Sequence, residues 1–279
     1  MYAGIETGGT KTVCAVGSDG SVAARTQFPT GDDPEVLAGK CAEFFADHEI
    51  ESVGIGTFGP CDVDPDSLTY GHILETPKPG WAHVDLLGLL QARIAVPMTL
   101  TTDVNAAALG ELRYGNAQGY NDVVYITVGT GIGGGVVAGG RLSPNRQHPE
   151  MGHMLLPQSV GPGVCPYHGN CFEGLAAGPG MQARAGVPAQ DLADDDPAWD
   201  VEADIVTAGL HNITLVLAPQ CIVIGGGLGS RDALHSRLPG RLTQSLNGYV
   251  PLPALRKPGL GSDAGVVGAL TLAQDHSQG

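Results

Sequence analysis

Short apolar runs and glycine-rich turns alternate with longer segments of helical spacing along this chain of 279 residues. The apolar runs at 4–7 and 12–17 are joined by a tight turn over 8–11, so they predict a β-hairpin, which 21–28 extends as a third strand. The elements predicted next are a helix over 33–48 with Pro34 in its first turn, a strand over 53–57, a helix near 85–93, a strand near 98–102 and an Ala-rich helix over 103–114.

The same succession of elements begins again in the second half. Strands are predicted over 122–128 and 132–139, with a tight glycine turn between them. The elements that complete this half are a helix over 203–217, a strand over 221–224, a turn at 225–227 and a closing helix over 263–273. Two successive β-β-β-α-β-α units indicate a duplicated α/β fold with a cleft between its halves, where a ligand would bind.

Charge and composition narrow the possible partners. The chain has 14 Lys and Arg against 29 Asp and Glu, a formal net charge of -15 at pH 7. Because this charge repels nucleic-acid phosphates, we expect no nucleic-acid partner. No apolar run approaches the ~20 residues that a membrane helix needs, and no basic segment opens the chain. The six cysteines fit a reducing compartment. We therefore expect a cytoplasmic protein without a membrane partner.

Residues 148–173, called here the zinc segment, concentrate histidine, cysteine and glutamate among glycines and prolines. Four side chains in it have the ligand chemistry that Zn²⁺ prefers: His153, Cys165, His168 and Cys171. The two-residue gaps between the last three suit chelating turns. Four protein ligands leave no open position, so we expect a structural zinc. The alternative without metal is a coincidence of buried thiols and surface histidines.

Glu150 and Glu173 flank these ligands. A closed zinc site would hold both carboxylates rigidly. The segment can therefore be a folding staple, a scaffold for a polar ligand site, or both.

The turn of the first predicted hairpin has the chemistry of a phosphate site. It combines backbone N–H groups that a ligand can approach closely, hydroxyls and one positive charge: Gly8, Gly9, Thr10, Lys11 and Thr12. A hairpin turn needs no ligand, so an ordinary turn is the alternative. The spacing is not that of a P-loop.

Two later glycine turns repeat this chemistry. Thr130 and Gly131 lie in the hairpin turn of the second unit, where a predicted strand follows the glycines. A dinucleotide-binding Rossmann site needs a helix there, so we reject that interpretation. Gly226 and Gly227 lie between a strand and a helix and could lie flat under an adenine or ribose; an ordinary strand-to-helix turn is the alternative.

Asp103 stands where a predicted strand ends and a helix begins. This is also an N-cap position, at which a carboxylate binds first-turn amides, so a structural role is the alternative. A carboxylate at the end of a strand, facing a phosphate-binding cleft, is also the oriented base that phosphoryl transfer to a hydroxyl requires.

Together these motifs resemble the ROK family of sugar kinases, within the actin-like ATPase superfamily, and are most similar to its bacterial fructokinase branch. The resemblance covers almost the whole chain. The segments that carry it are 5–11, 54–60, 76–81, 102–111, the zinc segment, 197–200 and 224–227.

The resemblance implies an α/β fold of two actin-like (ribonuclease H-like) ATPase domains flanking a cleft, with a zinc-binding loop. The N-terminal domain would span 1–115 and the C-terminal domain 116–262, with the helix at 263–279 packing back on the first. The implied activity is ATP-dependent phosphorylation of a hexose at its terminal hydroxyl, with Mg²⁺ bridging the nucleotide phosphates. The implied assembly is a homodimer.

The resemblance also assigns site residues. Asp103 would be the general base. The residues at sugar-binding positions are Glu150, His153, Glu173, Gly59, Pro79 and Gly80, with His153 serving also as a zinc ligand. The residues expected near the nucleotide are Gly8, Gly9, Thr10, Lys11, Thr12, Thr130, Gly131, Gly226 and Gly227.

Departures from the wider family refine these expectations. Thr102 precedes Asp103 where many glucokinases of the family have Asn, and the zinc loop is Cys-x-x-His-x-x-Cys instead of Cys-x-Cys-Gly-x-x-Gly-Cys. Both changes favour the fructokinase branch. Glu6 replaces the common first-strand Asp and would reach Mg²⁺ through water. Trp81 would either shape the sugar mouth or anchor the core.

We therefore expect conversion of D-fructose to fructose 6-phosphate. The alternatives are a kinase for glucose, mannose or an N-acylhexosamine and, less expected, a non-catalytic sugar-responsive regulator. A regulator of transcription needs a helix-turn-helix ahead of the first strand, and this chain starts at that strand.

Overall fold

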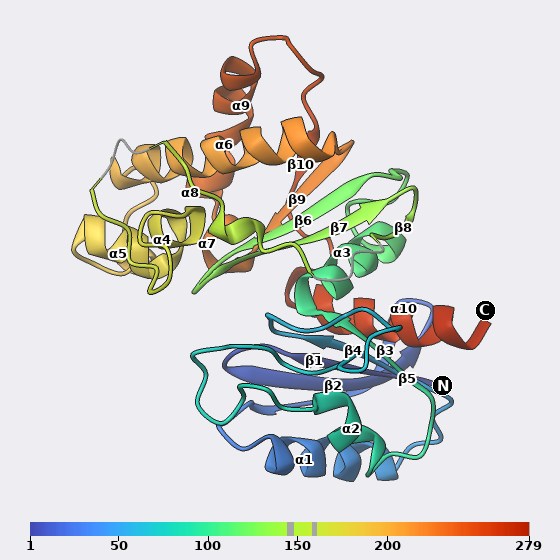
Figure 1. Cartoon of the computed structure of the whole chain (residues 1–279). Coiled ribbons are helices and arrows are strands. Elements are labelled where there is room, and N and C mark those ends of the chain that lie inside the picture. Colours follow the sequence, from blue (N-terminus) through green and yellow to red (C-terminus); the bar gives the residue numbers. More distant parts are fainter. Residues whose placement is uncertain (144–147, 158–160, 279) are drawn as a thin grey trace. The chain divides into compact units, whose positions relative to one another are not determined.

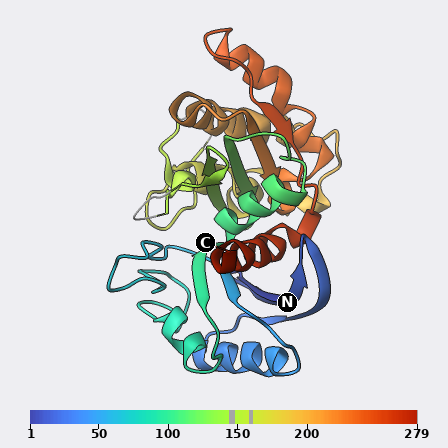
Figure 2. The same cartoon turned by 90° about the vertical axis from the view of Figure 1, so that its right-hand side faces the viewer.

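The computed structural model describes residues 1–143, 148–157 and 161–278. They form a mixed α/β fold with two five-stranded sheets (Figures 1 and 2). The strands of the first sheet are β1 (Tyr2–Thr7), β2 (Lys11–Ser18), β3 (Ser21–Pro29), β4 (Val53–Thr57) and β5 (Met98–Thr102). Their order is β3-β2-β1-β4-β5, with β1 antiparallel to β2 and parallel to β4.

The second sheet repeats this topology. Its strands are β6 (Val123–Val128), β7 (Ile132–Ala138), β8 (Arg141–Leu142), β9 (Cys221–Gly225) and β10 (Ala254–Arg256). The order is β10-β9-β6-β7-β8, so β6 takes the place of β1, and β9 and β10 take the places of β4 and β5. The predicted duplicated α/β fold is therefore confirmed.

Contacts between residues group the chain into two compact units. Unit 1 comprises Met1–Gly119, Gly135–Pro149 and Gly259–Gly279, and unit 2 comprises Tyr120–Gly134 and Glu150–Pro258. The sequence had placed 135–149 with the second half. Here Gly135 packs so closely on the helix that begins at Asp103 that an added Cβ would lie 2.1 Å from the carbonyl oxygen of Val104, which explains the grouping. The domain boundaries inferred from the resemblance stay a prediction.

In unit 1, helices cover both faces of the first sheet (Figure 1). Helices α1 (Pro34–Ala46) and α2 (Leu86–Gln91) pack on the face that carries Ile5 and Val16. Helix α10 (Ala264–Gln278) packs on the opposite face, which carries Val13 and Ala15. This alternation along β1 and β2 is what the period of two residues in a strand requires.

Helix α3 (Asp103–Tyr114), predicted with these bounds, is fixed by close packing against α10. A Cβ at Gly268 of α10 would lie 1.6 Å from the carbonyl oxygen of Ala106, so only glycine fits there. The carboxylate of Glu111, fully buried in α3, accepts hydrogen bonds from the amides of Gly259 and Leu260 at 2.8 and 2.9 Å. These contacts attach the C-terminal segment to the helix that begins with Asp103.

Trp81 is a core anchor. Its side chain is fully buried, its indole N–H donates to the carbonyl oxygen of Gly31 at 2.9 Å, and its ring meets Phe58 edge to face at 5.1 Å between centroids. The alternative that Trp81 shapes a sugar mouth is therefore wrong for this structure, because no face of the ring is left for a ligand.

Unit 2 is mainly helical outside its sheet. Its helices are α4 (Phe172–Ala176), α5 (Gly178–Ala185), α6 (Ala198–Leu217), α7 (Gly226–Gly229), α8 (Asp232–His235) and α9 (Leu238–Leu246). Short 3₁₀ turns are η1 (Met151–His153) and η2 (Ala189–Asp191), and a third, η3 (Gly261–Asp263), lies in unit 1.

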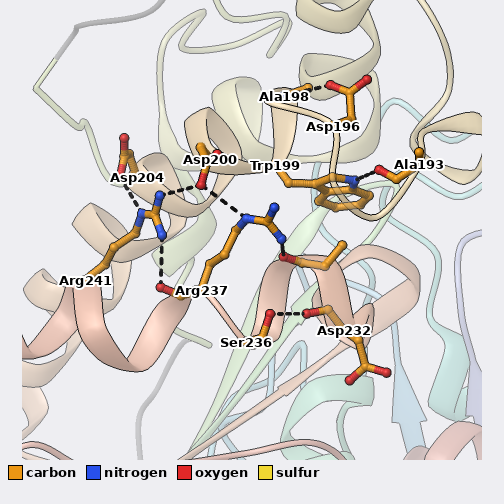
Figure 3. Close-up of polar contacts among 11 residues, drawn as sticks. Ala193, Asp196, Ala198, Trp199, Asp200, Asp204, Asp232, Ser236, Arg237 and Arg241 are labelled. Atoms are coloured by element: carbon orange, nitrogen blue, oxygen red, sulfur yellow. Dashed lines mark hydrogen bonds and ion pairs between the residues drawn. The ribbon is translucent and has the colours of Figure 1, made fainter.

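Helix α6 begins five residues earlier than predicted, because a polar and an aromatic contact extend its start. The carboxylate of Asp196 accepts from the amide of Ala198 at 2.8 Å, and Trp199 is fully buried. Figure 3 shows Asp200 between Arg237 and Arg241, whose nearest nitrogens lie 3.2 and 2.7 Å from it. The 197–200 motif therefore joins α6 to α9 and has a structural role.

Among the helices that the structure describes, none has the length and hydrophobicity that a membrane span requires.

Candidate active site

Asp103 is the first residue of α3, and Thr102 is its N-cap. The hydroxyl of Thr102 accepts a hydrogen bond from the amide of Asn105 at 3.3 Å, while Oδ1 of Asp103 accepts from the amide of Val104 at 2.8 Å. The prediction that Asp103 occupies the N-cap is wrong by one residue. Capping is thus already provided by Thr102, which removes the strongest structural explanation for an acid at position 103.

The turn that joins β1 to β2 is closed by its own backbone and by Thr30. The amide of Gly8 donates to the carbonyl oxygen of Lys11 at 2.9 Å, and the hydroxyl of Thr30 donates to the carbonyl oxygen of Gly8 at 2.7 Å. The hydroxyl of Thr12 is buried and lies 3.0 Å from that of Thr30. Thr12 is therefore occupied inside the turn, whereas Gly9 and Thr10 are exposed.

Glu6 of β1 packs against the start of α10. A Cβ on Gly265 would lie 2.5 Å from its carboxyl carbon. Burial raises the pKa of Glu6, and the nearby charge of Lys11 acts in the opposite direction. Oε2 of Glu6 is buried without a hydrogen-bond partner among the described residues. An unpaired buried oxygen near Lys11 of the predicted phosphate turn is consistent with the predicted role of Glu6 near Mg²⁺.

In unit 2 the turn between β6 and β7 is held by the zinc segment. The amide of Gly129 donates to the carbonyl oxygen of Gly131 at 3.0 Å, and Oε2 of Glu173 accepts from the amide of Ile132 at 2.9 Å. Glu173 was predicted to hold a sugar hydroxyl. The structure shows that one of its oxygens also fixes this turn.

A cavity of about 420 Å³ opens on the same turn. It brings together Thr130 and Gly227, both predicted to lie near the nucleotide, with Gln182 of α5, Gln190 of η2 and Arg231. Sequence reasoning missed the last three, because neither 178–190 nor Arg231 belongs to a recognised motif. Their convergence depends on how α5 and η2 return to the sheet.

Gly226 does not line the cavity, but it directly precedes Gly227, which does. Its φ is +84°, and a Cβ there would lie 2.4 Å from the carbonyl oxygen of Val128. Only glycine allows the chain to turn from β9 into α7 at this point.

The four predicted zinc ligands converge. One ligand atom from each of His153, Cys165, His168 and Cys171 lies within 4.8 Å of all the others. The two Nδ1 atoms are 3.3 Å apart, and Sγ of Cys171 is 3.5 Å and Sγ of Cys165 3.8 Å from Nδ1 of His153. A tetrahedron with zinc bonds of about 2.0–2.1 Å to nitrogen and about 2.3 Å to sulfur has edges of roughly 3.3–3.8 Å. The donor set therefore fits a closed zinc site.

Glu150 and Glu173 lie close enough to affect each other. Partial loss of hydration raises the pKa of Glu150, His153 opposes this shift, and the charge of Glu173 adds to it. The residue as a whole is exposed, so its carboxylate remains open to a ligand. Both acids thus lie beside the zinc ligands, as the sequence indicated.

The other predicted sugar residues lie in unit 1, in the loop that follows β4. Gly59 is half-buried, and Pro79 and Gly80 are exposed. Gly80 has a φ of +76°, and a Cβ there would lie 1.9 Å from the carbonyl oxygen of Asp32, so this position requires glycine.

Comparison with known proteins matches the ROK family over residues 2–276. The chain belongs to the ROK family. It is 39% identical to the fructokinase of Pediococcus pentosaceus, covering 98% of both proteins. It is also 39% identical to the fructokinase of Streptococcus mutans, covering 92% of this chain and 89% of that one. A ROK family glucokinase from Streptomyces griseus, solved with glucose and AMPPNP, superposes with a TM-score of 0.82 at 26% identity, covering 98% of this chain and 99% of that one.

Proposed function

We propose that this ROK protein catalyses ATP-dependent phosphorylation of D-fructose to fructose 6-phosphate. The observation that carries the proposal is its full-length similarity to fructokinases, which exceeds its similarity to the Streptomyces griseus glucokinase. The cysteine and histidine cluster and the cavity beside Thr130 are consistent with it.

Asp103 acts as the general base in this proposal. Its carboxylate removes the proton of the attacking sugar hydroxyl as the phosphoryl group transfers, a role worth about 10² to 10⁴ in rate. Glu150, His153 and Glu173 hold the sugar hydroxyls in this proposal, and Gly59, Pro79 and Gly80 also contact the sugar. Hydrogen bonds from these fixed groups orient one hydroxyl for reaction.

ATP binds with its base and ribose in the cavity that Thr130, Gly227 and Arg231 line. In this proposal Gly8, Gly9, Thr10, Lys11, Thr12 and Gly131 bind near the phosphates, and Gly226 binds near the adenosine. Mg²⁺ bound with ATP would offset the phosphate charge. We also propose a structural zinc held by the four-ligand cluster, a cytoplasmic location and a homodimer; the last two rest on composition and on the family resemblance.

The test is a steady-state assay with Mg-ATP across fructose, glucose, mannose, N-acetylglucosamine and N-acetylmannosamine, with ADP release measured for each sugar. We expect the highest kcat/KM for fructose. A higher kcat/KM for another sugar would make that sugar the substrate. An absence of sugar-dependent ADP release would refute the assignment as a sugar kinase.

The same assay tests the base. Asp103→Asn should keep the fold and fructose binding and lower kcat by roughly 10²-fold to 10⁴-fold. Asp232→Asn is the matched control, because the carboxylate of Asp232 is exposed and pairs with Lys257. Near-normal turnover in the Asp103 variant sinks the assignment.

A further inference from the structure

The start of α3 is held by a buried hydrogen bond that the proposed function has not used. Oγ1 of Thr102 lies 3.1 Å from Nδ1 of His148, and the two residues are 46 positions apart in the chain. Thr102 is 1% exposed and His148 9% exposed. Water can therefore replace this bond only with difficulty, and its loss would leave polar atoms buried.

Thr102 belongs to a row of threonines at the carboxyl ends of the parallel strands. Thr7 of β1 pairs with Thr57 of β4, and Thr57 pairs with Thr102 of β5. The hydroxyls of Thr7 and Thr57 are buried without a partner among the described residues. The hydroxyl of Thr102 has two partners, the amide of Asn105 and the ring of His148. Within this row, the hydroxyl next to Asp103 is the one that the structure fixes.

The chemistry of the pair is complete when the imidazole is neutral. Burial lowers the pKa of His148 to about 4, so the ring carries no charge near pH 7. A hydroxyl has one proton and two lone pairs. The hydroxyl of Thr102 accepts from Asn105, and its own proton can be donated to Nδ1 of a ring that is protonated on Nε2.

Asn105 adds a second attachment between the same two segments. Its Oδ1 accepts from the amide of Val136 at 3.3 Å, and its Nδ2 donates to the hydroxyl of Thr101 at 3.0 Å. The segment around β7 and His148 thus holds the first turn of α3 at two points. Asp103 lies between them in sequence, at the first position of the helix.

We propose that His148 is a positioning residue for Asp103: through Thr102 it fixes the first turn of α3 and so the direction of the Asp103 carboxylate. This inference rests on the proposed role of Asp103 as general base. It assigns to His148 an effect on the chemical step and none on substrate binding. Small displacements of a reacting group lower rates steeply, so the bond is expected to affect kcat.

The test compares four single variants of the full-length, zinc-loaded enzyme in the kinase assay, with folding checked by thermal melting. His148→Ala removes the bond and leaves the Thr102 cap intact. His148→Asn keeps a polar atom near the position of Nδ1. Thr102→Val removes bond and cap, and Thr102→Ser keeps both.

We expect His148→Ala to lower kcat roughly tenfold, with KM for fructose and ATP within about twofold of wild type. His148→Asn and Thr102→Ser should recover kcat to within about threefold. The double variant His148→Ala with Thr102→Val should be no slower than Thr102→Val alone, because both changes remove the same bond.

Two results overturn the inference: a wild-type kcat in His148→Ala, or equal losses in His148→Ala and His148→Asn, which would show that ring volume alone matters. A wild-type protein without sugar-dependent turnover would instead refute the proposed function, so the two failures are distinguishable.

Discussion

Two long segments that lie outside the sheets, one in each half of the chain, are held in place in different ways. Residues 58–85, called here the Trp81 segment, follow β4, and Trp81 and Ile73 within it are fully buried in the core of unit 1. The zinc segment buries Phe172 next to its last candidate ligand, but the loop around the other ligands leaves Leu155 73% and Tyr167 57% exposed. For this loop, a metal bound by the four converging candidate ligands would supply another source of order.

The same contrast is seen at the two glycine turns. The shared strand order gives both units a glycine turn at the equivalent place. The first turn is closed by Thr30, from its own meander, and the second by Glu173, from the zinc segment. We infer that the two sheets place the glycine turns at equivalent positions, and that the segments that close the turns make the turns functionally different.

Removing the metal is the strongest way to break the comparison. Zinc contributes on the order of 10 kcal/mol to the folding of small zinc-dependent peptides. Cys165→Ser should therefore lose zinc, lower the melting temperature and abolish fructose binding, because in the proposed function His153 serves both sites. Cys61→Ser, which changes a buried thiol in the Trp81 segment, should keep the metal.

Metal content by mass spectrometry and fructose affinity by calorimetry check this prediction. Unchanged fructose affinity in verified metal-free protein would contradict the shared role of His153.

Trp81→Ala tests how the Trp81 segment is held in place. Deleting a buried Trp typically costs about 3–5 kcal/mol through lost packing and a cavity. We expect a loss of that size in urea unfolding, with zinc content unchanged. Loss of zinc in this variant would show that the order of the zinc segment depends on the packing of the Trp81 segment.

Acid should weaken unit 1 through His148. Its folded pKa, lowered to about 4, lies below its usual value of about 6.5, so the unfolded chain binds the proton more readily between these values. Stability from this group is full above pH 6.5 and falls as pH decreases toward 4. Between pH 7 and 4.5 the loss is about 2 kcal/mol.

His148→Asn cannot titrate and should not show this part of the loss. Comparing wild type with the variant by urea unfolding at both pH values also separates His148 from acid release of zinc, which both proteins share. Equal losses in the two proteins would show that His148 does not titrate as its burial indicates.

Substitution of Glu173 has the smallest expected effect. This residue joins the zinc segment to the turn between β6 and β7 by one hydrogen bond. Glu173→Ala leaves the amide of Ile132 without its acceptor, at a cost of about 1 kcal/mol, so KM for ATP should rise roughly fivefold to tenfold. Glu173→Gln keeps an acceptor oxygen and should largely spare KM for ATP while weakening fructose binding. If both variants leave KM for ATP unchanged, the turn does not depend on this bond.

The sequence predicted the strands and helices of unit 1 well because their signals are local, but it gave no bounds for β8, β10, α4, α5, α8 and α9. Apolar runs between turn or helix signals gave β1, β2, β4 and β5 to within two residues, and α3 with its full bounds. The start of α6 was missed because it depends on the burial of Trp199, a tertiary contact.

Site residues could be predicted from the sequence where the residue types themselves indicate the ligand, as His and Cys do for zinc. The four candidate zinc ligands were predicted from donor type and spacing, and their ligand atoms converge. The hydrogen bond between Thr102 and His148 could not be found this way, because it joins residues 46 positions apart. Nor could Gln182 and Arg231 at the cavity, since their meeting depends on the paths of α5 and α8.

Product analysis after incubation with Mg-ATP and fructose tests the central claim most directly. Phosphorus NMR should show fructose 6-phosphate formed in step with ADP, and roughly 10²-fold to 10⁴-fold more slowly by Asp103→Asn. Phosphate on a different oxygen of fructose, or no sugar phosphate at all from the zinc-loaded wild type, would contradict the account.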